Sequence, residues 1–233
     1  MKLVKLLANL GYGSRKETQR LIRSGAVTDE AGHVLSENDL PPHDQILFRG
    51  EELDPPSPLV IMLHKPDGYT CSSEDPGSTI YDLLPPRYAL RNPGLNPIGR
   101  LDKDTTGLLL LTDDGKLLHK IIHPKSGCLK VYHAVLDRPL EGHETELFAS
   151  GTLVLNNENR PLLPAKLEIL NEKEALITLH EGRYHQVRRM FAAAGNHVLD
   201  LKRISIGSLK LPDDLDEGDW RALQPEELES IFR

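Results

Sequence analysis

The segment NPIGRLDKDTTGLLLLTDDG (residues 96–115) joins a polar, charged loop to the most concentrated apolar run of the chain. Residues 107–112 read GLLLLT, a run too short to span a membrane and of the length typical of a strand buried on both faces. Asp102 lies in the loop before it, two residues after Arg100, whose guanidinium would favour the ionised carboxylate. A carboxylate on a loop held by a rigid strand is a candidate nucleophile or base, and a solvated DKD loop is the alternative.

Length and composition narrow the possible classes of protein. A chain of 233 residues fits one large domain or a large domain with a small one, and about 150 residues per domain favours the second. Cys71 and Cys128 lie far apart with no CxxC pairing, so we expect neither a disulfide framework nor a zinc site. This use of cysteine favours a reducing, cytoplasmic location. Because no apolar run reaches about 18 residues and the N-terminus has no small-residue cleavage site, we expect no membrane segment and no signal peptide.

The net charge of −7 hides a segregation of charge along the chain. Residues 1–28 carry six Lys or Arg against one acid, and residues 87–138 carry nine against five. Residues 29–54 and 212–233 each carry eight acids. Basic patches on an acidic body are consistent with local contacts to phosphate, although ordinary solvated faces would give the same counts.

The first 53 residues are expected to form a small α/β module. Leucines at helical spacing predict a helix over residues 2–10, and the S-x-x-E capping box at Ser14 predicts a second helix ending at Gly25. Strands are expected at residues 26–28, 33–35 and 45–49. Cations at Lys16, Arg20 and Arg23 follow one stripe of the second helix. Two short helices, the second basic, followed by a hairpin resemble the S4 RNA-binding domain, which implies RNA contacts from four residues: Arg15, Lys16, Arg20 and Arg23.

Residues 54–59 are rich in proline and are predicted to be a stiff, extended linker that few contacts cross, which implies a mobile N-terminal domain. Residues 60–233 should form the second domain. Its expected strands are 60–64, 107–112, 130–136, 165–170, 175–180, 197–204 and 208–211, and its expected helices are 80–84, 116–122, 184–194 and a capped helix from Pro225, with 144–149 continuing the alternation. Since strands outnumber helices without strict alternation, we predict an α+β fold with a mixed, mostly antiparallel sheet.

Three clusters in this domain could carry chemistry: GRLDKDTTG (99–107), KVY (130–132) and EGRYHQVRRM (181–190). Taken singly, each cluster is weak evidence for a catalytic site. A tyrosine on a strand usually packs in the core or lies on the surface, and an arginine-rich helix start usually forms a solvated face. Together, in this order and with HKPDGYTCS (64–72), they resemble the motifs of the RsuA-type pseudouridine synthases over nearly the whole chain. The last cluster resembles most the members that act on small-subunit ribosomal RNA, with the large-subunit members as the alternative.

The resemblance implies an isomerase that converts a flipped-out uridine of ribosomal RNA to pseudouridine without a cofactor or a metal. Asp102 would be the catalytic carboxylate, Arg188 its basic partner, and Tyr132 the residue that packs on the uracil and helps with the proton at C5. Arg100 would support the flipped nucleotide or fill its place, and Asp104 would be loop structure only. Further substrate contacts would come from three residues: Lys130, Gln186 and Arg189. The implied partner is ribosomal RNA or a ribosomal subunit assembly intermediate, and the protein would act as a monomer.

Two other functions compete with this prediction. DKDTT matches the D-x-D-x-T pattern of aspartate-dependent phosphoryl transfer, but there the aspartate follows a hydrophobic strand, whereas here the leucine run comes after Asp102. A non-catalytic RNA-binding or ribosome-assembly protein would explain the basic helix and leave the cluster of Asp102, Tyr132 and Arg188 without a purpose. His119 and His123 are spaced by four, but with no cysteine partner they indicate no metal site.

Overall fold

The computed structural model describes residues 2–72, 76–123 and 127–232. A small unit at the N-terminus packs two helices on a three-stranded antiparallel sheet of order β1-β2-β3. Its elements are α1 (Leu3–Asn9), α2 (Arg15–Arg23), β1 (Val27–Asp29), the 3-10 turn η1 (His43–Gln45), β2 (Ile46–Phe48) and β3 (Glu51–Glu52). The unit has an apolar core of its own, which includes Leu3, Leu7 and Ile46, all fully buried.

Local sequence signals explain both helices of this unit. Gly11 has φ +92° and ends the first helix, because this left-handed conformation is open to glycine at little cost. Ser14 and Glu17 form the predicted capping box: the Ser14 side chain accepts from the Glu17 amide, and the Glu17 carboxylate accepts from the Ser14 amide at 2.7 Å. The strand predicted at 33–35 is wrong, because only an isolated bridge joins Val34 to Thr28. The short strand β3 was not predicted.

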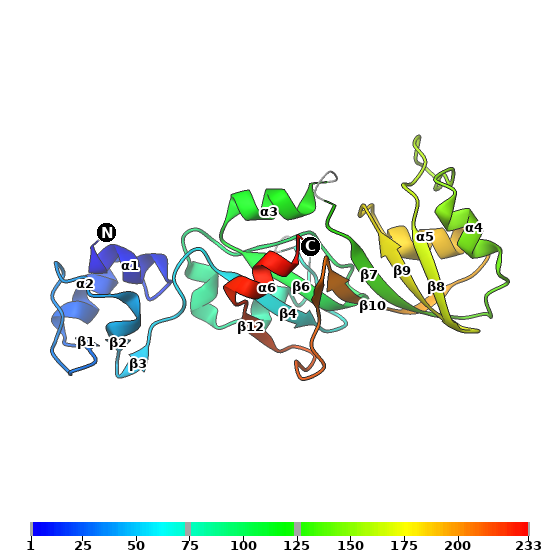
Figure 1. Cartoon of the computed structure of the whole chain (residues 1–233). Helices are drawn as coiled ribbons and strands as arrows, with labels where there is room; N and C mark the ends of the chain where they lie inside the picture. Colours follow the sequence, from blue (N-terminus) through cyan, green and yellow to red (C-terminus); the bar gives the residue numbers. More distant parts are fainter. Residues whose placement is uncertain (1, 73–75, 124–126, 233) are drawn as a thin grey trace.

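The rest of the chain forms one long sheet of order β12-β4-β6-β10-β7-β9-β8, with β5 paired to β6 and β11 to β10 (Figure 1). Its strands are β4 (Val60–Lys65), β5 (Asn96–Pro97), β6 (Thr106–Thr112), β7 (Lys130–Leu136), β8 (Lys166–Asn171), β9 (Glu174–Leu179), β10 (Val198–Ile206), β11 (Leu209–Lys210) and β12 (Trp220–Ala222). Among the described strands, β6 and β10 pair in parallel and every other pairing is antiparallel. The predicted α+β fold with a mixed, mostly antiparallel sheet is confirmed.

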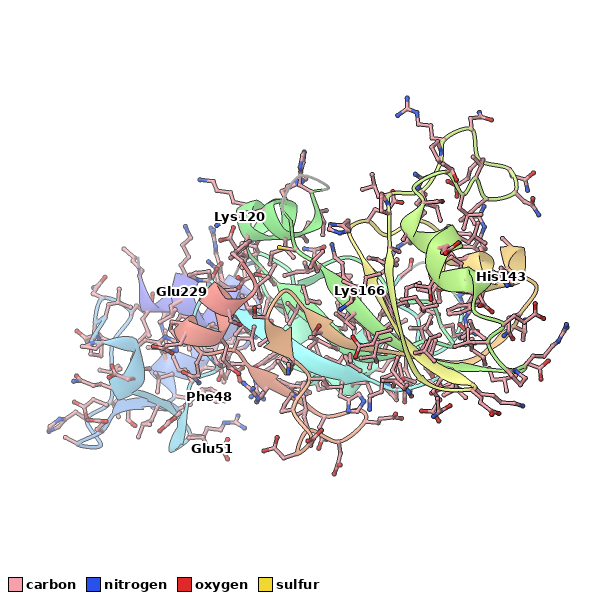
Figure 2. All side chains as sticks on the ribbon, turned by 45° about the vertical axis from the view of Figure 1, so that its right-hand side comes forward. Phe48, Glu51, Lys120, His143, Lys166 and Glu229 are labelled. Carbon is pink, nitrogen blue, oxygen red and sulfur yellow. The ribbon has the colours of Figure 1, made fainter. Side chains whose placement is uncertain are left out.

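Helices cover this sheet at both ends. They are the 3-10 turns η2 (Ile80–Leu83) and η3 (Pro86–Leu90), and the helices α3 (Gly115–Ile122), α4 (His143–Ala149), α5 (Gln186–Ala193) and α6 (Pro225–Ser230). Figure 1 shows α3 and α6 near the middle of the molecule and α4 and α5 at the end far from the N-terminal unit. In Figure 2, Phe48 and Glu51 mark the sheet of the N-terminal unit, and His143 lies toward the opposite end. Within the described residues, every helix is too short or too polar to cross a membrane.

Strand β6 is buried on both faces, as its apolar run predicts. Leu108 and Leu110 pack into one apolar cluster with residues of α3, whereas Leu109 and Leu111 pack into another on the opposite face. A third cluster lies where α4 and α5 cover β7, β8 and β9, and the rings of Phe148 and Phe191 meet edge to face there at 5.2 Å. Strand β6 therefore provides a rigid support for the loop that precedes it.

The segment between the two units makes many contacts, so the prediction of a linker that few contacts cross is wrong. Asp54 is 8% exposed, and Arg87 of η3 donates to both of its carboxylate oxygens. The Asp54 amide donates to the hydroxyl of Tyr12 at 3.1 Å, and the amide of Asn92 donates to the carbonyl of Asn9 at 2.8 Å. Composition suggested a solvated, proline-rich segment, whereas its one acid is a buried partner of both units.

Candidate active site

The loop of residues 98–105 is anchored on both sides of Asp102. Ile98 and Leu101 are buried, and the Leu101 amide donates to the sulfur of Cys71 at 3.4 Å. The Thr105 amide donates to the Asp102 carbonyl at 3.1 Å and closes a tight turn. The carboxylate therefore projects from a fixed turn immediately before β6.

The side chain of Lys65 holds this turn in place through hydrogen bonds. Lys65 is the last residue of β4 and is fully buried. Its ammonium donates to the carbonyls of Lys103 (3.0 Å), Thr105 (2.9 Å) and Pro66 (3.0 Å), and burial lowers its pKa. Three carbonyl acceptors compensate the buried ammonium, so Lys65 fixes the backbone around Asp102.

Gly107 allows β10 to approach the same place. It has φ +102°, and a Cβ added there would lie 2.3 Å from the carbonyl oxygen of Arg203. A side chain would therefore push β10 away from β6. The close approach brings Leu201 of β10 to the wall of the cavity that contains Asp102.

The beginning of α5 completes the site. His185 precedes the helix in the left-handed conformation (φ 47°, ψ 36°), and its Nε2 lies 3.4 Å from Oδ1 of Asp102. The ring of Tyr184 stacks on the His185 ring with centroids 3.9 Å apart. Gln186 is buried, and its side-chain oxygen accepts from the Arg183 amide at 2.9 Å. This part of the chain is thus folded against the loop of residues 98–105.

These elements enclose a small polar cavity of about 70 Å³. Its walls come from the loop of residues 98–105, from β7, β9 and β10, and from the start of α5. The lining residues are Arg100, Leu101, Asp102, Thr105, Tyr132, Leu179, Gly182, Arg183, Gln186, Val187 and Leu201. A neighbouring cavity of about 130 Å³ shares Arg100 and Tyr132 and adds Lys130 and Arg203. A larger cavity of about 710 Å³ lies on the other face of the sheet, because Val131 and His133 line it and alternate with Tyr132 along β7. We place the candidate active site in the smaller cavity because it contains Asp102.

The charge state of Asp102 reflects opposing influences. Burial raises the pKa of its carboxyl group, and the negative charge of Asp104 acts in the same direction. The charges of His185, Arg188 and Lys65 favour the ionised form and lower the pKa. Burial is the largest of these influences and the net change is a raised pKa, so the carboxylate is a stronger base than an exposed aspartate.

The sequence predicted several of these residues, and the structure brings most of them together. Asp102, Tyr132, Arg100 and Gln186 line one cavity, and Lys130 lines the adjacent one. Tyr132 packs between the apolar clusters at the two ends of the sheet. The predicted residues thus share one region although they come from distant parts of the chain.

Arg188 does not contact Asp102 directly, in contrast to its expected role as the basic partner. Its guanidinium lies 3.1 Å from the Asp104 carboxylate and donates to the carbonyls of Asp104 and Val198, each at 2.9 Å. Within the part of the chain that the structure describes, His185 is the ion-pair partner of Asp102, and the charge of Arg188 acts on Asp102 through space. Asp104, which the sequence suggested was only loop structure, anchors Arg188 instead.

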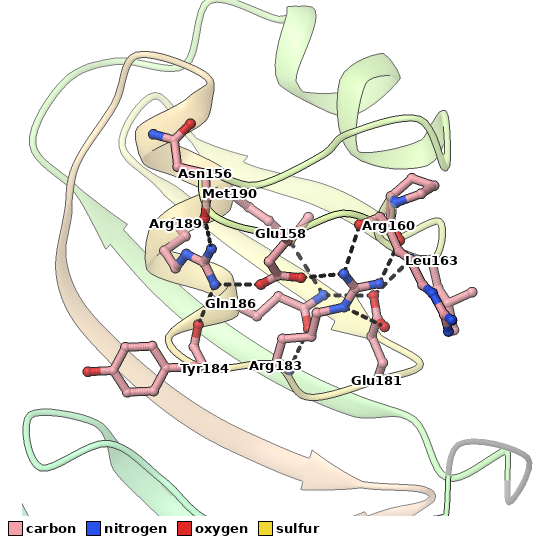
Figure 3. Close-up of polar contacts among 11 residues, drawn as sticks. Asn156, Glu158, Arg160, Leu163, Glu181, Arg183, Tyr184, Gln186, Arg189 and Met190 are labelled. Carbon is pink, nitrogen blue, oxygen red and sulfur yellow. Dashed lines mark hydrogen bonds and ion pairs between the residues drawn. The ribbon is translucent and has the colours of Figure 1, made fainter.

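Arg189 does not belong to the lining of the cavity, and its side chain joins a polar network (Figure 3). It contacts Glu158 at 2.6 Å and donates to the carbonyls of Tyr184 (3.1 Å) and Asn156 (2.5 Å). Glu158 also pairs with Arg183, which contacts Glu181 at 3.0 Å. The network fastens the segment before α5 to the loop around residue 158.

The cations of the N-terminal unit lie on the exposed side of α2. Four are exposed: Arg15, Lys16, Arg20 and Arg23. Thr18 and Ile22 are buried on the opposite side of the helix. Arg23 pairs with Glu37 at 2.8 Å, so its charge is already partly compensated.

Lys65 and His185 were not recognised as site residues from the sequence. A lysine at the end of a strand that begins with the apolar run VIML is a signal of a buried cation, because its charge then needs local acceptors. His185 gives no such signal, since its contact with Asp102 depends on a left-handed backbone that the letters YHQ do not indicate. Distance in sequence hides this contact.

Comparison with known proteins identifies the class of this chain. Residues 59–193 match the family model for RNA pseudouridylate synthase. The chain belongs to this family and is an RNA pseudouridine synthase, an enzyme that isomerises uridine to pseudouridine. The matched segment includes the loop with Asp102, the strand with Tyr132 and all of α5.

Relatives extend the similarity to the whole chain. "Ribosomal small subunit pseudouridine synthase A" of Vibrio cholerae is 41% identical, with all of both chains covered. The protein of the same name from Pasteurella multocida is 44% identical, with 98% of each chain covered. A crystal structure of a pseudouridylate synthase matches with a TM-score of 0.70 and 39% identity over 99% of both chains.

Proposed function

We propose that this enzyme converts a specific uridine of small-subunit ribosomal RNA to pseudouridine. The observation that carries the proposal is a half-buried carboxylate, Asp102, which shares a small cavity with Tyr132 and Gln186. The choice of RNA rests on full-length relatives whose name specifies the small ribosomal subunit. Similarity over the entire length, including the N-terminal unit, favours the same class of substrate.

The reaction breaks the bond between N1 and C1′ of the nucleotide and forms a bond between C5 and C1′. A proton leaves C5 and N1 gains one, so atoms balance and no electrons are exchanged with another molecule. We assign Asp102 as the carboxylate that attacks the sugar or the base, or that assists formation of a glycal. Each route needs the ionised carboxylate, and the partly buried site makes it more reactive than it would be in water.

The surrounding residues have roles that follow from their positions. Tyr132 lines the same cavity as Asp102. We assign its ring to packing on the uracil and its hydroxyl to assisting loss of the C5 proton. Arg188 contributes positive charge through space while it anchors Asp104. We assign Arg100, Lys130 and Gln186 to the bound nucleotide, and the paired side chain of Arg189 to the support of the segment before α5.

The target uridine must leave its stack to reach this cavity, at a cost of a few kcal/mol. We propose that residues 1–53 are an RNA-binding module of the S4 type that helps to offset this cost. Residues 54–59 would be the connection, and residues 60–233 the catalytic domain. The separate apolar core and the four exposed cations of α2 support this division.

We further propose that the enzyme acts in the cytoplasm as a monomer, without a cofactor or a metal. Its substrate would be ribosomal RNA, either free or in an assembly intermediate of the small subunit. The chemistry supports the absence of a cofactor, because an isomerisation with one carboxylate requires no redox partner. The relatives named for a ribosomal subunit support the choice of ribosomal RNA as the substrate.

Mapping of pseudouridines tests this function. Unmodified transcripts of both ribosomal RNAs would be incubated with the enzyme in buffer containing EDTA, treated with carbodiimide and read by primer extension. We expect one new stop in the small-subunit RNA. A stop confined to large-subunit RNA would overturn the choice of substrate, and no stop in either RNA would overturn the cofactor-free reaction on free RNA.

A further inference from the structure

Tyr184 presents an exposed aromatic ring beside the catalytic carboxylate. The residue is 73% exposed, the largest exposed fraction among the large hydrophobic residues that the structure describes. Its ring is nearly parallel to that of His185, with an interplanar angle of 17° and centroids 3.9 Å apart. Because His185 covers one ring face and most of the residue is exposed, the opposite face is open to solvent.

The backbone under this pair is strained. His185 adopts φ 47° and ψ 36°, a left-handed conformation that costs free energy for any residue with a side chain. Such a conformation persists only where its surroundings enforce it, and it is common at functional sites. Here the contact between His185 and Asp102 at 3.4 Å ties the stacked rings directly to the catalytic centre.

The polar network described above braces the backbone of the pair and leaves the Tyr184 ring free. Arg189 donates to the Tyr184 carbonyl at 3.1 Å and is itself held by Glu158. In Figure 3 the Tyr184 ring points away from this network, while its carbonyl points into it. The ring is therefore presented outward on a fixed support.

The charges around the ring favour a base over a phosphate as its ligand. Arg189 and Arg183 are paired with Glu158, and Arg188 is paired with Asp104. These nearby cations are already compensated, so the surface offers an aromatic face more than free positive charge. Stacking on such a face is how proteins bind unpaired bases, whatever their identity.

We propose that the stacked rings of Tyr184 and His185 form a platform for the unpaired nucleobase next to the target uridine. The inference rests on the proposed function, because a flipped uridine leaves the face of a neighbouring base uncovered. Tyr184 then takes the place of the uridine as the stacking partner of that neighbour. It also holds the strand one ring away from Asp102, so the platform sets the position of the target as well as its affinity.

Steady-state kinetics of the full-length enzyme on a small-subunit RNA transcript test the platform. Tyr184→Ala should raise KM by roughly 5- to 150-fold, the range expected for removal of one aromatic stacking interaction. Tyr184→Phe keeps the ring and should restore most of the affinity, whereas Tyr184→Leu keeps apolar area without an aromatic face and should lie between them. Leu170→Ala is the matched control, since Leu170 is 48% exposed on β8, away from the cavity.

The outcomes separate this inference from the proposed function. If wild-type enzyme forms pseudouridine in the transcript and the Ala, Leu and Phe variants share one KM, the platform is wrong and the function stands. If Leu170→Ala raises KM as much as Tyr184→Ala, the effect is not specific to the platform and the inference is also overturned. Absence of product with wild-type enzyme contradicts the proposed function itself. Should Tyr184→Ala unfold, the comparison of the Leu and Phe variants decides.

Discussion

Two aspartates, one between the two units and one in the cavity proposed as the active site, differ in how completely their charge is compensated. Arg87 donates to both oxygens of Asp54, and the Tyr88 hydroxyl donates to one of them at 3.4 Å. Among the described residues, Asp102 forms an ion pair with His185 at 3.4 Å, and the nearby charge of Asp104 opposes its ionisation. The side chains of Asp54 and Asp102 are 8% and 28% exposed, respectively.

This difference separates a structural from a reactive carboxylate. A carboxylate with a bidentate arginine partner is stabilised in its ionised form and can join two parts of a fold. A partly buried carboxylate with weaker compensation stays basic and can act on a substrate. Removal of Asp54 should therefore affect stability most, and removal of Asp102 should affect catalysis most.

The largest effect is expected for Asp102→Asn. The amide keeps the size of the side chain but cannot act as a nucleophile or base, so the rate of isomerisation should fall by at least about a thousandfold. RNA affinity should stay nearly unchanged, because the phosphate contacts lie elsewhere. Carbodiimide primer extension and a filter-binding assay measure the two properties. An undiminished stop would remove Asp102 from the mechanism.

Asp54→Ala should give the second-largest effect, and it should appear in stability. Loss of one member of a buried ion pair costs several kcal/mol, but the Arg87 side chain is 45% exposed, so we expect about 2 kcal/mol. Thermal unfolding measures this as a fall in Tm of roughly 4–8 °C. Glu30→Ala, at an exposed position, is the control and should change stability by less than about 0.5 kcal/mol. Equal Tm values for the two variants would contradict the structural role of Asp54.

His185→Gln should change how the reaction depends on pH. Activity needs ionised Asp102, so it falls as pH drops through the pKa of that group, which burial has raised. Without His185, Asp104 still disfavours ionisation, and the largest opposing influence is lost while those of Arg188 and Lys65 remain, so the pKa should rise further. The acidic limb of kcat, measured at saturating RNA, should therefore move to higher pH. A shift to lower pH, or none, would exclude His185 as the group that holds Asp102 ionised.

The smallest effect concerns the N-terminal unit. Replacement of Lys16, Arg20 and Arg23 by alanine should flatten the dependence of RNA affinity on salt, by roughly 0.7–0.9 for each phosphate that is no longer neutralised. Because Arg23 already pairs with Glu37, the total change should correspond to nearer two phosphates than three. Lys166→Ala with Lys173→Ala, at the far end of the sheet, is the control pair. An unchanged slope for the triple variant would show that α2 does not contact phosphate.

Patterns along the sequence predicted much of the fold, because most elements carry their own local signals. The GLLLLT run, the capping box at Ser14 and the apolar spacing of α1 each predicted an element that the structure contains. Strands β5 and β12 were not predicted, since each has only two or three residues, and β12 also pairs with the distant strand β4. The strand expected at 33–35 failed because local composition does not show whether a partner strand is present.

Part of the candidate site was also predicted, because some of its residues lie in motifs that local sequence reveals. Asp102, Tyr132 and Gln186 lie in recognisable motifs, and the structure places them around one cavity. The contact between His185 and Asp102 depends on a left-handed residue and on the packing of α5, which no local pattern encodes. The pairing of Arg188 with Asp104 likewise depends on two segments that meet only in three dimensions. Motifs thus identified the participants but not their partners.

Release of tritium from small-subunit RNA labelled at C5 of uridine tests most directly the contrast between the two aspartates. Formation of the bond between C5 and C1′ displaces the label into water, so the assay follows the chemical step itself. We predict that Asp54→Asn, assayed below its Tm, releases tritium at close to the wild-type rate and that Asp102→Asn releases none above background. Release by Asp102→Asn at the rate of Asp54→Asn would contradict the assignment of Asp102 as the catalytic carboxylate.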